Sequence, residues 1–165
     1  MAKYLAGLDY GTGGAKACII DEEARVLSYA YREYPIIVEH PGWSEHDPRR
    51  YWEAAEELLK ECIQKAGADA KEIAAIAVSS ALPCLVMLDG EGEPIHKAYN
   101  LMDKRAWREA EELRENPGEK EIFALSGNRL EDHPSIVNLL WEKRNRPQAF
   151  ARIQKVNTID GYIRF

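Results

Sequence analysis

The chain has 165 residues, of which 45% are hydrophobic and 30% charged, so it has the length and composition of one globular domain with a substantial core. Its formal net charge of -6 argues against a general nucleic-acid binder, which would carry an excess of basic residues. No apolar run reaches the roughly 18 residues of a membrane span, and 3 widely spaced cysteines without a CxxC pair favour a reducing, cytoplasmic setting.

Strand signals open the chain. The apolar run over 3–10 ends at Asp9, a glycine-rich turn covers 11–14, and a second short run spans 15–20. A polar turn then leads into an alternating segment over 25–33. Two hairpins in succession predict an antiparallel meander at the amino terminus.

A helix is predicted over 48–66, after an irregular loop over 39–47. Asp47 is a residue type that commonly caps the start of a helix, and Pro48 fits the first helical position. Gly67 is a residue type that commonly ends a helix. Residues that recur at steps of three and four predict the buried face of this helix: Trp52, Ala55, Leu59, Cys62 and Ala66.

The continuously apolar segment over 73–79 predicts a fully buried strand. Residues 84–89 predict another strand before a turn at 90–92, and 95–101 a further extended segment. Strands, a helix, strands and then helices indicate an α/β or α+β domain without an internal boundary. The later helices are predicted over 104–115, 118–126, 134–145 and 147–153.

The octet Asp9–Lys16 joins the first two predicted strands. A strand-end carboxylate such as Asp9 can hold a hydrated Mg²⁺, and a glycine-rich hairpin lets backbone N–H groups approach phosphate oxygens. Thr12 adds a hydroxyl donor, and Lys16 adds a positive charge close by. This pattern is typical of a phosphate-binding turn.

Two other phosphate-binding motifs do not fit the octet. A Walker loop needs GxxxxGK followed by Ser or Thr and a helix, and a dinucleotide fingerprint needs GxGxxG at the start of a helix. Here Lys16 follows Ala15 where the Walker loop has Gly-Lys, and Lys16 also stands at the sixth position of GxGxxG, where the fingerprint has its last glycine. A strand follows where either motif needs a helix. On the octet alone, a plain hairpin turn in which Asp9 caps its own backbone remains an equal alternative.

Four blocks of the chain, LDYGTGGAK, PGWSEHDP, VSSALPCLVMLD and YNLMDKRA, occur in the order found in the amino-terminal domain of the FGGY carbohydrate kinases, which include xylulokinase, ribulokinase and glycerol kinase. The first block is shared by actin-like ATPases in general, whereas PGWSEHDP is specific to the family. SGNRL and LLWEKRNRPQAFARIQKV resemble a late part of the same domain, so the resemblance runs from Lys3 to Phe165. It implies an α/β ribonuclease-H-like fold of the actin and hexokinase superfamily: a mixed sheet with amino-terminal antiparallel hairpins and flanking helices.

The resemblance also implies an activity: ATP-dependent, Mg²⁺-assisted phosphoryl transfer to a hydroxyl of a small-molecule sugar or polyol. No nucleic acid or membrane is expected as a partner, and homo-oligomerisation is left open. By resemblance, Asp9 would lie at Mg²⁺, Gly11, Thr12 and Gly13 at the phosphates, and Lys16 close to them. Donors plus a metal suit phosphoryl transfer, because its catalysis is mostly positioning and charge stabilisation.

Leu82 and Pro83 stand where many relatives have Met-His and where glycerol kinases have Arg-Glu. These two residues would form an apolar wall of the sugar site, so glycerol binding through an Arg-Glu pair is not expected. His133 lies where some relatives offer a substrate-facing aromatic, and a turn role beside Pro134 is an equal alternative.

Asp103 matches the family's sugar-facing aspartate, although the preceding tryptophan of that block is replaced. Its carboxylate would accept two hydrogen bonds from vicinal hydroxyls, with Arg105 as an ion partner. The alternative is the N-cap of the predicted helix over 104–115.

Structural roles are favoured over catalytic ones for the polar residues of PGWSEHDP. Trp43 is expected to be a partly buried anchor and Asp47 a helix cap. Glu45 and His46 are expected to form a polar contact with another loop.

Residues 1–165 are expected to form an incomplete amino-terminal kinase domain. By resemblance, the catalytic aspartate that accepts the proton of the sugar hydroxyl would lie beyond Phe165, as would the carboxy-terminal nucleotide-binding half, so this chain would hold no catalytic residue. Two alternatives remain: an actin-like module that binds nucleotide or sugar without catalysis, and a structural fragment without a ligand.

Overall fold

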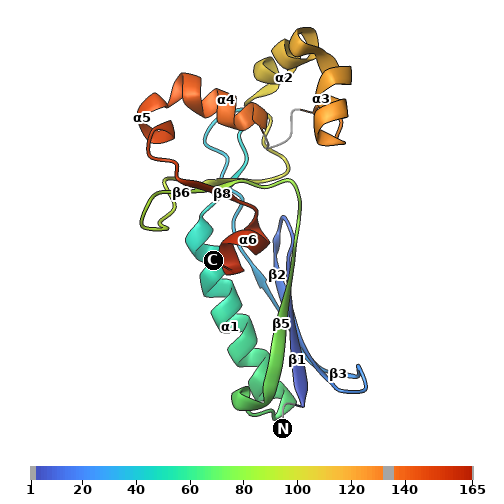
Figure 1. Cartoon of the computed structure of the whole chain (residues 1–165). Coiled ribbons are helices and arrows are strands. Elements are labelled where there is room, and N and C mark those ends of the chain that lie inside the picture. The colour runs from blue at the N-terminus through green and yellow to red at the C-terminus, as the bar shows by residue number, and fades with distance from the viewer. Residues whose placement is uncertain (1–2, 132–135, 165) are drawn as a thin grey trace. The chain divides into compact units, whose positions relative to one another are not determined.

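A computed structural model describes residues 3–131 and 136–164 (Figure 1). The described chain divides into two units, one of residues 3–36, 46–81 and 158–164, the other of 37–45, 82–131 and 136–157. Within these described ranges, no helix is long and apolar enough to cross a membrane.

A four-stranded sheet forms the centre of the first unit. Its strands are β1 (Tyr4–Tyr10), β2 (Gly14–Asp21), β3 (Val26–Glu33) and β5 (Ile73–Ser80), in the order β3-β2-β1-β5. The pairs β1–β2 and β2–β3 are antiparallel, and β1–β5 is parallel. The predicted meander and the mixed sheet are therefore confirmed.

Helix α1 (Pro48–Ala66) packs on β2 and β3, and covers one face of this sheet (Figure 1). Asp47 caps it by accepting a hydrogen bond from the backbone N–H of Arg49 at 3.0 Å, as predicted. Gly67 ends it with φ 63°, in the left-handed region that favours glycine.

The buried face of α1 differs from the predicted one. Ala55 and Cys62 are buried as expected, whereas Trp52 is 55% exposed. Tyr51 and Leu58 have no exposed surface instead. Leu59 and Ala66 are half-buried, at the edge of this face. One residue turns a helix by about 100°, so Trp52, one position after the buried Tyr51, points away from the sheet.

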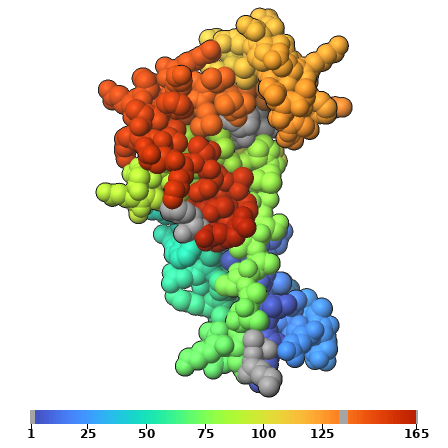
Figure 2. Space-filling model, in the orientation of Figure 1, coloured from blue at the N-terminus to red at the C-terminus, as the bar shows by residue number. Residues whose placement is uncertain are grey.

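Strand β5 is exposed along most of its length, and Figure 2 shows residues 73–80 at the surface. The prediction of a fully buried strand is therefore wrong in the described structure. The reason is topological, because β5 is the edge strand of the described sheet and pairs there with β1 alone. The 3₁₀ turn η1 (Ala70–Glu72) precedes β5, and α6 (Ile159–Arg164) completes the described unit.

The second unit contains short strands. β4 (Glu45–His46) pairs with β7 (Ala98–Tyr99), and β6 (Val86–Leu88) pairs antiparallel with β8 (Lys155–Asn157). The extended segment predicted over 95–101 is thus reduced to two residues, and β4 and β8 were not predicted.

Helices α2 (Trp107–Leu113), α3 (Glu119–Ser126), α4 (Ile136–Asn145) and α5 (Pro147–Phe150) form the rest of the second unit. The segment η2 (Arg114–Gly118) connects α2 to α3 across a kink at Asn116, where the backbone is extended. Helix α2 begins three residues later than predicted, and α5 ends earlier. The cluster at the centre of these helices consists of Ala106, Ala110, Leu130 and Val137.

Candidate functional site

The turn between β1 and β2 is a tight hairpin closed by a hydrogen bond from the Gly11 N–H to the Gly14 carbonyl at 2.9 Å. Asp9 and Lys16 lie opposite each other on the two strands. Lys16 Nζ is 3.6 Å from Asp9 Oδ2, and the two side chains are 64% and 50% exposed. A carboxylate and an ammonium group are therefore both accessible next to a glycine-rich turn.

The glycines of the turn differ in how much space surrounds them. A Cβ on Gly14 would lie 2.4 Å from the Arg32 carbonyl oxygen and 2.7 Å from the Tyr31 hydroxyl, so only glycine fits there. A Cβ on Gly13 would meet nothing closer than 4.0 Å. Gly14 was not among the predicted site residues, although it is the last glycine of the GTGG run.

Two buried side chains contact the main chain of the hairpin from the protein interior. The Tyr34 hydroxyl donates to the Gly11 carbonyl, and the His46 ring hydrogen-bonds the Thr12 backbone. Burial lowers the pKa of His46 to about 4, so the ring is neutral near neutral pH. His46 also lies 2.7 Å from the Tyr51 hydroxyl through Nδ1. The expected polar contact of His46 exists, and the contribution of Tyr34 was missed.

The metal-binding capacity of the hairpin is that of one carboxylate. Among the described residues, no group of three or more His, Cys, Asp or Glu side chains could hold a metal ion by itself. Mg²⁺ usually takes one or two protein carboxylates together with waters and substrate phosphates. Asp9, half exposed and 3.6 Å from the Lys16 ammonium group, fits that kind of ligand.

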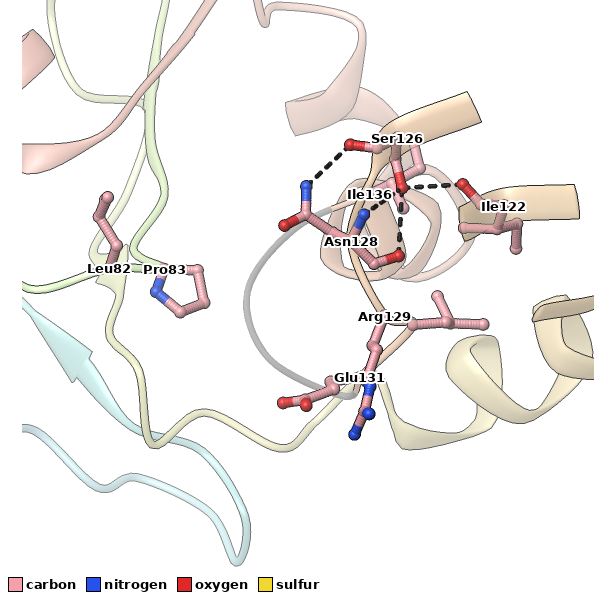
Figure 3. A pocket seen from close by; sticks show the side chains of 9 residues that line it. Leu82, Pro83, Ile122, Ser126, Asn128, Arg129, Glu131 and Ile136 are labelled. Carbon is pink, nitrogen blue, oxygen red and sulfur yellow. Dashed lines mark hydrogen bonds between the residues drawn. The ribbon is translucent and has the colours of Figure 1, made fainter. Parts of the chain in front are cut away.

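A separate cavity of about 740 Å³ lies within the second unit. Figure 3 shows Leu82 and Pro83 on one side of it, and residues of α3 and the following loop on the other. Leu82 is 58% exposed, as a wall of an open cavity would be. The lining residues are Leu82, Pro83, Ile122, Ser126, Asn128, Arg129, Leu130, Glu131 and Ile136.

Asp103 has no exposed surface. Its carboxylate accepts hydrogen bonds from the Ser44 N–H at 2.8 Å, from Asn138 Nδ2 at 3.3 Å and from the Arg105 guanidinium. The expected ion pair with Arg105 is confirmed, but the N-cap role is wrong because α2 begins at Trp107. The structure buries this carboxylate inside the second unit. His133 lies outside the described residues.

The PGWSEHDP block has the structural roles expected of it. The Trp43 ring is partly buried and lies 3.8 Å from the Arg105 guanidinium carbon, with Trp141 in edge contact at 5.5 Å. Glu45 accepts a hydrogen bond from Arg105 Nη2 at 2.7 Å. The same guanidinium carbon lies over the Tyr99 ring, 3.9 Å from its centroid. Cation–π stacking and charge pairing together hold the loop in the second unit.

Comparison with known proteins gives consistent results. The family model "FGGY family of carbohydrate kinases, N-terminal domain" matches residues 4–165. A glycerol kinase from Shewanella baltica is 29% identical over 98% of this chain and 33% of its own length. An autoinducer-2 kinase from Salmonella choleraesuis is 33% identical over 98% of this chain and 31% of its own length.

The crystal structure of xylulose kinase from Rhodospirillum rubrum has a TM-score of 0.91 to this chain at 29% identity, covering 98% of this chain and 33% of that protein. This likeness confirms the predicted α/β fold of the actin and hexokinase type. The chain spans about a third of the length of the curated relatives it matches. It belongs to the FGGY family of carbohydrate kinases, whose amino-terminal domain it matches from residue 4 to residue 165.

Proposed function

We propose that the protein containing this chain transfers a phosphoryl group from ATP to a hydroxyl of a small-molecule sugar or polyol. The observation that carries the proposal is the β1–β2 hairpin, in which the exposed side chains of Asp9 and Lys16 lie opposite each other beside a glycine turn. Membership of a carbohydrate kinase family supports it. In this proposal the chain supplies the phosphate hairpin and part of the sugar site.

Each hairpin residue has one task in the proposed reaction. The N–H groups of Thr12 and Gly13 bind phosphate oxygens, and the Thr12 hydroxyl adds a donor. Gly11 lets the phosphates approach without a side chain in the way, while its own N–H closes the turn on the Gly14 carbonyl. Lys16 supplies positive charge beside them, and Asp9 holds Mg²⁺ directly or through water. Mg²⁺ bound there would neutralise the negative charge that develops on the phosphoryl oxygens.

The sugar side of the proposal rests on the cavity at Leu82 and Pro83. Its volume of about 740 Å³ is in the range of small-molecule sites. Both residues offer apolar surface, while polar groups come from the opposite wall, including Ser126 and Asn128. Asp103 is assigned a structural role, because its buried carboxylate joins segments of the unit that carries the cavity. The sugar-facing role suggested for His133 stays a proposal.

The proposal assigns no catalytic base to residues 1–165. The chain covers about a third of its relatives' length. We propose that the base and the adenosine-binding half belong to another part of the same protein. The family resemblance supports this division.

The test is sugar-dependent release of ADP by the whole protein. Glycerol, xylulose and autoinducer-2, the compounds that name its relatives, form the first substrate panel, and the acceptor found is then used with Asp9→Ala. We expect the variant to lose turnover by orders of magnitude and to unfold at the wild-type temperature, since the side chain is half exposed.

Glu22→Ala is the matched control, because this exposed carboxylate lies at the opposite end of β2. It should leave turnover unchanged. Wild-type turnover in Asp9→Ala would contradict the proposal. Binding of MgADP without ADP release for any acceptor of a broad panel would favour a non-catalytic binding module.

A further inference from the structure

Two hydrogen bonds reach the hairpin backbone from buried side chains, and they end on consecutive residues. Tyr34 donates through its hydroxyl to the Gly11 carbonyl. The hydrogen bond between the His46 ring and the Thr12 backbone favours the protonated ring, so the ring is the donor and the Thr12 carbonyl the acceptor. Two successive carbonyls of the turn are thus fixed from the interior.

Peptide planarity converts these contacts into a direction for the amide groups. In a trans peptide the C=O of one residue and the N–H of the next point in opposite directions. The described cis peptides lie elsewhere, at Leu82-Pro83 and Asn116-Pro117. With the Gly11 and Thr12 carbonyls directed to the interior, the N–H groups of Thr12 and Gly13 point away from it. Neither N–H donates a hydrogen bond to another described residue.

His46 is itself held in one orientation. Only 1% of its surface is exposed, and a neutral imidazole has one donor and one acceptor nitrogen. We assign Nε2 as the donor toward Thr12, which leaves Nδ1 to accept from the Tyr51 hydroxyl at 2.7 Å. The backbone carbonyl of Tyr51 in turn accepts a hydrogen bond from the Tyr10 hydroxyl at 3.0 Å.

Ring packing restricts the same side chains further. The Tyr34 ring meets those of His46 and Tyr51 edge to face, with centroids 5.0 and 5.3 Å apart, and His46 meets Tyr51 at 5.6 Å. Tyr34 and Tyr51 are 4% and 0% exposed. Tyr34 directly follows β3, His46 is the second residue of β4, and Tyr51 lies in α1. All three belong to the first unit, so its fold determines where they lie.

We propose that Tyr34, His46 and Tyr51 are positioning residues that aim the Thr12 and Gly13 amides at the nucleotide phosphates. These three residues are called the Tyr–His–Tyr support below. The proposal rests on the proposed function, in which the hairpin binds phosphate. The PGWSEHDP block, besides making structural contacts, would then help to orient the phosphate-binding hairpin through His46.

The test compares the affinities of MgADP and adenosine, because only the first carries phosphates. The whole protein is titrated with each by calorimetry. Tyr34→Phe removes the hydroxyl and keeps the ring, so we expect MgADP affinity to fall roughly 3- to 10-fold, the equivalent of one hydrogen bond. Adenosine affinity should stay within about twofold, and Tyr51→Phe should act in the same direction through His46.

Controls separate positioning from a general structural role. Tyr29→Phe removes a hydroxyl from a tyrosine that is 75% exposed, and should change neither affinity. His46→Gln keeps one donor and one acceptor, and should retain more MgADP affinity than His46→Leu. The two Tyr→Phe variants decide the question if the His46 variants do not fold.

Asp9→Ala distinguishes failure of the inference from failure of the proposed function. If Asp9→Ala weakens MgADP while Tyr34→Phe and Tyr51→Phe bind like the wild type, the support proposal is wrong and the proposed function stands. Equal losses for MgADP and adenosine would also overturn the support proposal. If the wild type binds MgADP no better than adenosine, the proposed function itself is contradicted.

Discussion

Asp103 and Arg105 form a two-point ion pair in which neither side chain has exposed surface. Nε lies 2.9 Å from Oδ1, and Nη2 lies 2.7 Å from Oδ2. Nη2 also contacts Glu45, and the guanidinium lies against the rings of Trp43 and Tyr99. One buried cation therefore joins the PGWSEHDP loop to the segment before α2.

Removal of one partner of this pair should destabilise the protein strongly. Asp103→Ala leaves Arg105 buried without its main counter-ion, and breaking such a pair costs about 3–5 kcal/mol. We expect a large fall in the free energy of unfolding, measured by urea denaturation of the whole protein. The sugar KM of the protein that remains folded should be unchanged, because the carboxylate is buried.

Glu56→Ala is the control for this experiment. It removes an exposed ion pair with Lys60, 2.9 Å long, on the outer face of α1, and should have no measurable effect on unfolding. A normally stable Asp103→Ala protein with a strongly raised sugar KM would show instead that the carboxylate contacts the substrate.

The glycines of the hairpin should respond differently to alanine. Gly14→Ala places a methyl group 2.4 Å from the Arg32 carbonyl, which is backbone and cannot move aside cheaply. It should lower the melting temperature by many degrees and disturb the β2–β3 pairing. Gly13→Ala has space, so it should fold normally and only weaken nucleotide binding. Equal melting temperatures in the two variants would contradict this prediction.

Protonation of His46 should reduce stability in mild acid. Its folded-state pKa of about 4 is below the ordinary value of about 6.5, so the unfolded chain binds a proton at higher pH than the folded chain does. The free energy of unfolding should therefore fall as the pH drops from 6.5 towards 4. The full loss is on the order of 3 kcal/mol.

Urea denaturation at pH 7, 5.5 and 4.5 checks this sign, with His46→Gln as the variant that lacks the titrating ring. The variant should lose less stability than the wild type over this range. The imidazole proton signals of the wild type give a second check, since they should titrate near pH 4. A midpoint near 6.5 would mean that the ring is not buried as described.

Elements with strong local signals could be predicted from the sequence. Asp47, Pro48 and Gly67 mark both ends of α1 by local chemistry, and the glycine run marks the β1–β2 turn. Exposure could not be predicted in the same way. β5 has an apolar run typical of a buried strand, yet its burial depends on which segments pack beside it. β4 and β8, with two and three residues, are too short to show a periodicity.

The candidate site shows the same division. The DYGTGG hairpin is contiguous in sequence, so Asp9 and Lys16 could be identified as charged residues beside the turn, whereas their register comes from the structure. Tyr34 is 23 residues from Gly11, and its contact depends on how β3 leaves the sheet. Asp103 meets the Ser44 backbone across 59 residues, so its burial could not be inferred from the adjacent helix signal.

The central claim is that Asp9 acts on nucleotide binding through Mg²⁺. The most direct test is a double cycle in which ADP binding by the whole protein is measured for wild type and Asp9→Ala, each with Mg²⁺ and with a chelator. The account predicts that Mg²⁺ strengthens ADP binding to the wild type and adds little for Asp9→Ala, because the two changes remove one interaction. Equal strengthening by Mg²⁺ in both proteins would contradict the account.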